Sequence, residues 1–156
     1  IDRRPEVKMV EFCTQHDIKL LAYGTLCGGL LSETYLGRPQ PTRTELNTAS
    51  LGKYKQMIDA WGSWELFQEL LVALKVIADR HSVSIANVAV RYVLDKPAVA
   101  GAIVGVRLGV SDRRDNNRRV FDFGLDSVDQ DQIEAVLGKS QDLYRMIGDC
   151  GDEYRR

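Results

Sequence analysis

The amino-acid sequence predicts an α/β protein built around a parallel sheet. Two short apolar segments, residues 18–23 and 98–106, have the composition of buried strands. Helical patterns precede and follow each segment, and this alternation is typical of parallel sheets. Two parallel strands alone would leave unpaired edges and an exposed apolar face, so we expect further strands to come from elsewhere.

Length and composition fit one domain over residues 1–156. Charged residues make up 28% and hydrophobic residues 44% of the chain, and its net charge is -1. This balance excludes a disordered chain and offers no field for nucleic acid, and no apolar run is long enough to span a membrane. The three cysteines lack CxxC spacing, which argues against a disulfide framework or a metal site and favours the cytoplasm. The first residues contain neither a starting Met nor an apolar signal-peptide core, and we expect the chain to be cut from a longer one.

The elements before residue 62 follow from local patterns. Pro5 fits the first turn of a helix that we expect over residues 5–15. The apolar run 18–23 is bounded by a glycine and predicts the first strand. Glycines, prolines and threonines then predict a long loop up to residue 62, which a short helix over about 51–60 interrupts.

Two consecutive helices carry the clearest periodicity in the chain. Ser63 is a suitable N-cap, and apolar residues recur at helical spacing over 64–80. Ser84 caps a second helix with one apolar face, which ends before Pro97. The small and β-branched residues 98–106 then predict the second strand.

Helices also follow the second strand. We expect one over residues 111–121. Ser127 and Gln130 form a capping box that predicts a last helix over about 128–138. The tail beyond Asp142 is polar, and whether residues 144–156 are ordered stays open.

Two loops that contain glycines follow the two predicted strands. The first covers residues 23–31 and the second residues 105–117. Backbone N–H groups of such loops can bind an anion, and α/β folds place their ligands at the carboxyl ends of strands. Arginines of the second loop suit phosphate, and its asparagines suit the edge of an adenine. Glycine loops also serve as simple turns, and the second segment equally fits a solvated helix face, so both alternatives stay open.

The order of four segments resembles the C-terminal part of the aldo-keto reductases. The segments are residues 18–31, 86–94, 103–107 and 116–123. The resemblance covers the chain from about residue 4 to residue 143. It implies the C-terminal part of a (β/α)8 TIM barrel, with the two strands in the places of the seventh and eighth, so that the chain is incomplete as a barrel on its own.

The same resemblance implies that NADPH or NADP+ binds in extended form across both loops. In the first loop, Tyr23 would lie against the nicotinamide ring. The backbone of Gly24, Leu26 and Gly28 would approach the pyrophosphate. An aromatic face suits a planar ring, and N–H groups suit an anion.

The second loop would hold the adenosine half of the cofactor. Gly105, Val106 and Arg107 would flank the 2′-phosphate, Arg113 would pair with that phosphate, and Asn116 and Asn117 would contact the adenine. Arginine and amide side chains have the hydrogen-bonding groups that these contacts need.

The resemblance implies no catalytic residue in this chain, because the family's catalytic Asp, Tyr, Lys and His come from earlier strands. The intact enzyme would transfer a hydride from NADPH to an aldehyde or ketone, and the chain would need its missing N-terminal half or a second copy as a partner. Two alternatives stay open. One is a noncatalytic NADP(H)-binding or regulatory half-barrel, and the other is a structural remnant that oligomerises.

Overall fold

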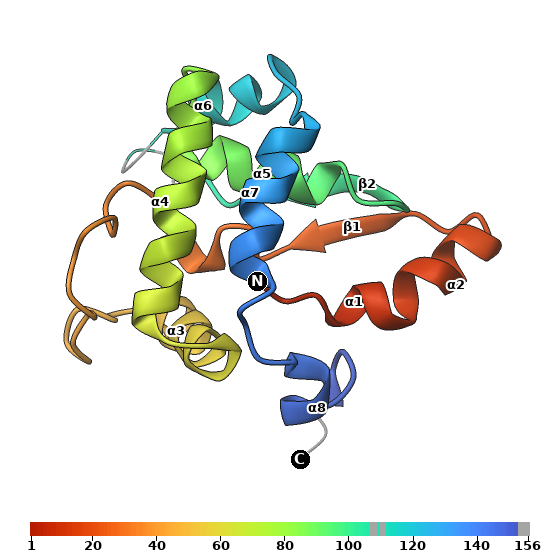
Figure 1. Ribbon diagram of the computed structural model, residues 1–156, viewed down its shortest axis with the longest axis horizontal. Coiled ribbons are helices and arrows are strands. Elements are labelled where there is room, and N and C mark those ends of the chain that lie inside the picture. The colour runs from red at the N-terminus through yellow and green to blue at the C-terminus, as the bar shows by residue number, and fades with distance from the viewer. Residues whose placement is uncertain (107–108, 110–111, 153–156) are drawn as a thin grey trace.

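The computed structural model describes residues 1–106, 109 and 112–152 of the mixed α/β chain (Figure 1). Its elements are, in order, α1 (Arg4–Val7), α2 (Met9–Gln15), β1 (Leu20–Tyr23), the short 3-10 helix η1 (Cys27–Gly29), α3 (Ala49–Trp61), α4 (Trp64–Arg80), α5 (Ile85–Leu94), β2 (Val99–Ile103), α6 (Arg114–Arg118), η2 (Arg119–Phe121), α7 (Ser127–Leu137) and α8 (Leu143–Ile147). Within the described ranges, no helix is both long and apolar enough to cross a membrane.

The sheet consists of β1 and β2, which pair in parallel and lie next to each other in Figure 1. The paired residues run from Leu20 opposite Val99 to Tyr23 opposite Ile103. The predicted parallel arrangement is therefore confirmed. The two strands end at the same edge of the sheet, which brings the starts of both glycine loops together.

One face of this sheet is open, so the expectation of two fully buried strands was wrong. Leu21 and Tyr23 of β1 are 65% and 69% exposed, and Ile103 of β2 is 59% exposed. The apolar composition of the strands is correct, but within the described chain nothing covers the side on which these side chains stand. A sequence pattern reports that a face is apolar and leaves open what packs against it.

The hydrophobic core lies between the helices. α4 packs against both α5 and α7, as Figure 1 shows. Phe67, Leu71 and Ile77 of α4 are almost completely buried, and Ile58 and Trp61 of α3 join them. The predicted boundaries of α4 are confirmed, because the Ser63 side chain accepts a hydrogen bond from the amide of Leu66 and starts the helix.

Three predicted helix boundaries differ from the structure. The helix expected over 5–15 is broken at Lys8, which has φ -140°. The short helix in the long loop begins at Ala49, two residues early, with Thr48 as its N-cap. The helix expected over 111–121 is described as α6 and η2 over residues 114–121, while Ser111 lies outside the described residues.

The capping box of α7 is formed by Asp126 and Asp129 in place of Ser127 and Gln130. Both residue pairs suit a capping box, so the sequence pattern alone is ambiguous by one position. The structure selects Asp129 because its buried carboxylate also contacts Arg80 and His81 at the end of α4. A further helix, α8, follows α7, so α7 is not the last helix.

Candidate functional site

Both predicted ligand loops leave the sheet at one edge. Tyr23 and Ile103 are paired neighbours at the carboxyl ends of β1 and β2. The Tyr23 ring and the Ile103 side chain stand on the open face beside the two loops. The sheet therefore provides one exposed apolar surface at the edge where α/β folds bind their ligands.

The first loop is a compact turn that closes on itself. The amide of Cys27 donates to the carbonyl of Gly24 at 2.9 Å, and the amide of Gly29 donates to the carbonyl of Leu26 at 2.8 Å. Gly24 and Gly28 have φ values of +69° and +67°, which residues with a side chain rarely adopt. These bonds and angles explain the glycine spacing of the loop without reference to a ligand.

Polar groups of the first loop remain without a partner in the described part of the chain. The amides of Thr25 and Leu26 donate to no protein acceptor. The Thr25 hydroxyl is buried and makes no hydrogen bond. Two neighbouring free N–H groups match the needs of an anion such as a phosphate.

Helix α3 lies directly on this loop. A Cβ atom added to Gly24 would stand 2.1 Å from the Tyr54 hydroxyl oxygen. A Cβ atom added to Gly28 would stand 2.8 Å from Ser50 Oγ and 3.0 Å from Tyr54 Cδ2. The close backbone approach that the glycines permit is therefore made by Tyr54 and Ser50. No sequence signal indicated Tyr54, because a long irregular segment separates it from Gly24 in the chain.

The second loop is open on the side that the structure describes. Gly105 does not have a positive φ, and a Cβ atom there would meet nothing within 4 Å. Val106 is exposed. Arg107 lies outside the described residues. Arg113 is exposed at the start of α6, where its carbonyl accepts the amide of Asn117 at 2.8 Å.

Asn116 joins α6 to the start of α5. Its Nδ2 donates to Ser84 Oγ at 3.2 Å, and its backbone carbonyl accepts a hydrogen bond from Asn87 Nδ2 at 2.7 Å. The contact with Ser84 orients the side chain and leaves its Oδ1 as the atom available to a base edge. Asn117 is half-buried on the same helix.

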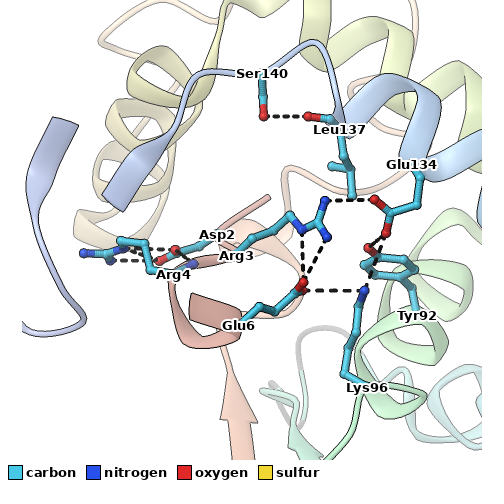
Figure 2. A network of polar contacts seen from close by, with 9 residues as sticks. All are labelled: Asp2, Arg3, Arg4, Glu6, Tyr92, Lys96, Glu134, Leu137 and Ser140. Atoms are coloured by element: carbon cyan, nitrogen blue, oxygen red, sulfur yellow. Dashed lines mark hydrogen bonds and ion pairs between the residues drawn. The ribbon is translucent and has the colours of Figure 1, made fainter. Parts of the chain in front are cut away.

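A polar cluster lies away from these loops, between α1, α5 and α7 (Figure 2). The Tyr92 hydroxyl donates to Glu134 Oε1 at 2.5 Å, and Arg3 Nη1 donates to Glu134 Oε2 at 2.8 Å. Lys96 Nζ stands 4.2 Å from the centroid of the Tyr92 ring and 3.5 Å from a Glu6 carboxylate oxygen. The cluster connects three helices that are distant in sequence.

The electrostatics of this cluster favour a fixed proton on Tyr92. Burial raises the pKa of Tyr92, and the hydrogen bond to Glu134 and the charge of that carboxylate raise it further. Burial alone would raise the pKa of Glu134, but the Tyr92 hydroxyl, Arg3 and Lys96 outweigh burial and lower it. A tyrosine whose proton is held by a carboxylate is a poor acid catalyst, and we interpret this cluster as a connection between helices.

Hollows of the described surface also lie elsewhere. One lies between α4 and α7 and is lined by Val72, Val76 and Ala135, among others. Another lies between α1 and α8 and includes Val7 and Leu143. Among the residues that the structure describes, no group of three or more His, Cys, Asp or Glu side chains is arranged to hold a metal ion.

Comparison with known proteins identifies the family. The aldo/keto reductase family matches residues 1–137. The chain belongs to the aldo/keto reductase family. This aldo/keto reductase chain is also 36% identical over 89 residues to flagellar radial spoke protein 5 of Chlamydomonas reinhardtii. The match covers 56% of this chain and 17% of that protein, so the chain corresponds to a small part of its relative. The mixed α/β structure, with its parallel strand pair, is consistent with part of a domain of this family.

Proposed function

We propose that the chain is the NADP(H)-binding C-terminal part of an aldo/keto reductase barrel, with β1 and β2 as the seventh and eighth strands. The carrying observation is the common edge at which Tyr23 and Ile103 pair, because it places both loops beside one exposed aromatic ring. Family membership supports the choice of NADP(H) as the ligand.

The groups present fit the two ends of an extended dinucleotide. The Tyr23 ring would hold the nicotinamide by its face, and the free amides of Thr25 and Leu26 would bind the pyrophosphate. Because Tyr54 lies on the side of Gly24 and Gly28 where a Cβ atom would stand, the pyrophosphate would approach the loop amides from another side. Arg113 would pair with the 2′-phosphate, and Asn116 Oδ1 would accept a hydrogen bond from the adenine.

Bound NADPH would supply the hydride for an aldehyde or ketone. The residues of this chain would orient the cofactor. The acid that protonates the reduced carbonyl would come from another segment, because the described cluster around Tyr92 holds its own proton. A noncatalytic NADP(H)-binding role is the second candidate. The hydrogen bond that the Tyr92 hydroxyl donates to Glu134 favours it, because this tyrosine then supplies no acid for catalysis.

The open face of the sheet supports a need for further strands. Leu21, Tyr23 and Ile103 would each leave water if neighbouring strands or a second copy covered them. The cytoplasm is the proposed compartment, since Cys13 and Cys27 are free thiols. Burial raises the pKa of the Cys27 thiol, which suits a packing role in a reducing environment.

Isothermal titration of the chain with NADP+ and with NAD+ tests the proposal. We expect saturable binding of NADP+ and weaker binding of NAD+, which lacks the 2′-phosphate. Arg113→Ala should weaken NADP+ binding about tenfold and leave NAD+ binding unchanged, because an arginine and phosphate pair is a strong charge-assisted contact. Arg118→Ala on the same helix is the matched control.

Two results would contradict the proposal. Failure of the wild-type chain to bind NADP+ would remove the cofactor site. Reduction of an aldehyde by the chain alone would show that the acid catalyst lies within it.

A further inference from the structure

Tyr54 makes the closest contact between α3 and the first loop. Its hydroxyl end lies against Gly24 and its Cδ2 edge lies against Gly28, so one ring spans both glycines. The virtual Cβ distances of 2.1 Å and 3.0 Å leave no room for a side chain at either position. The backbone of the loop therefore rests on the aromatic ring itself.

The core holds Tyr54 in this place. Ile58 and Trp61, one and two turns further along α3, are almost completely buried. Lys55 is also buried and pairs with Asp59 at 2.5 Å. Thr48 caps the other end of the helix by accepting the amide of Leu51 at 3.1 Å. Because both ends of α3 are held, the ring is a rigid support for the loop.

The loop needs such a support because glycine is the most flexible residue. Gly24 and Gly28 can each leave the left-handed region at little cost, and either change would turn the intervening amides of Thr25 and Leu26. Groups that are held in their binding arrangement before the ligand arrives bind it more tightly, since less ordering is lost on binding.

We infer that Tyr54 is the positioning residue of the proposed pyrophosphate site: it presses on Gly24 and Gly28 and thereby keeps the Thr25 and Leu26 amides pointed at the ligand. This inference rests on the proposed NADP(H) function. The aromatic ring carries the effect, because it is the ring that spans the two glycines. Of the two glycines, the hydroxyl lies against Gly24.

The test compares two ligands in titrations of the chain and its variants. NADP+ contains the pyrophosphate, whereas adenosine 2′-phosphate carries only the adenosine end. Tyr54→Ala should weaken NADP+ binding about tenfold and leave adenosine 2′-phosphate binding unchanged, because only the first loop loses its arrangement. Tyr54→Phe retains the ring and should bind NADP+ within about twofold of wild type. Tyr144→Ala in α8 is the matched control for the loss of a tyrosine.

Hydrogen exchange of the ligand-free protein gives an independent readout. The amides of Cys27 and Gly29 are bonded within the loop, and Tyr54→Ala should speed their exchange about tenfold while the amides of α4 exchange as in wild type. Tyr54→Leu serves in place of Tyr54→Ala if the smaller side chain prevents folding.

The outcomes separate the two proposals. Unchanged NADP+ binding in Tyr54→Ala, or equal weakening of both ligands, would overturn the positioning role. If wild type binds neither ligand, the NADP(H) function fails, and the exchange of the loop amides alone decides whether Tyr54 positions them. Unchanged exchange in the variant would then refute the inference.

Discussion

Removal of the Tyr92 hydroxyl should destabilise the chain by a defined amount. Tyr92→Phe deletes the donor of the 2.5 Å hydrogen bond to Glu134 and keeps the ring. Lys96 remains over that ring. The substitution therefore isolates one contact between α5 and α7.

The magnitude follows from the exposure of the acceptor. A hydrogen bond to a charged group contributes roughly 1.5–3 kcal/mol to stability. The Glu134 side chain is 38% exposed, so water replaces part of the lost bond. We expect Tyr92→Phe to lower the free energy of unfolding by about 1–2 kcal/mol. The ion pair of Glu134 with Arg3 is exposed on both sides and contributes less, about 0.2–1 kcal/mol.

Urea unfolding near neutral pH, followed by circular dichroism, measures this difference. Tyr144→Phe is the control, because its hydroxyl is 3.5 Å from Asp149 and its loss should cost less than about 0.5 kcal/mol. The lowered pKa of Glu134 means that its contribution is present above the unfolded value of 4.5 and is lost as pH falls through the folded pKa. The cost of Tyr92→Phe should therefore shrink in acid. Equal stability of Tyr92→Phe and wild type near neutral pH would refute the assignment.

Three further outcomes are expected. The pKa of Tyr92 is raised, so its stabilising contribution is complete below the unfolded value of 10.0 and is lost as pH rises toward the folded value. In a tyrosinate absorbance titration, Tyr92→Phe should therefore remove a tyrosine that ionises late; identical titrations would contradict this. Asp129→Ala should lower the free energy of unfolding by about 3 kcal/mol in urea, because it removes a buried carboxylate that contacts Arg80 and His81 and accepts the capping bond from the Asp126 amide. A loss below about 1 kcal/mol would show that the contact between α4 and α7 does not depend on Asp129. Phe67→Ala should cost about 3–5 kcal/mol because the ring is fully buried, whereas Phe121→Ala, at 75% exposure, should stay within about 0.5 kcal/mol; similar costs would contradict the position of the core.

Much of the fold could be predicted where one segment carries its own instructions. Helix 64–80 has a cap at Ser63 and an apolar stripe, and both are local properties that the structure repeats to the residue. Ser84 likewise starts α5 with a capping box. Where two neighbouring residues satisfy the same local rule, as Asp126 and Ser127 do, the prediction was one position off. The contacts of Asp129 with α4 decided that case.

The candidate site divides in the same way. Sequence order placed the two loops after strands, and the predicted cofactor-binding residues belong to segments 23–31 and 105–117. The contacts that set the loop geometry were invisible in the sequence. Tyr54 meets Gly24, and Asn116 meets Ser84, only because the core brings their helices together.

By itself, the sequence determined the helices with their own caps, the parallel strand pair and the aldo/keto reductase family, because these depend on residues close in the chain or on motifs in a fixed order. Only the tertiary structure decided which group touches the first loop, which carboxylate joins α4 to α7, and which face of the sheet stays open. The physical reason is that packing depends on what lies opposite a side chain in space. A local pattern gives the polarity of a surface and carries no information on its partner.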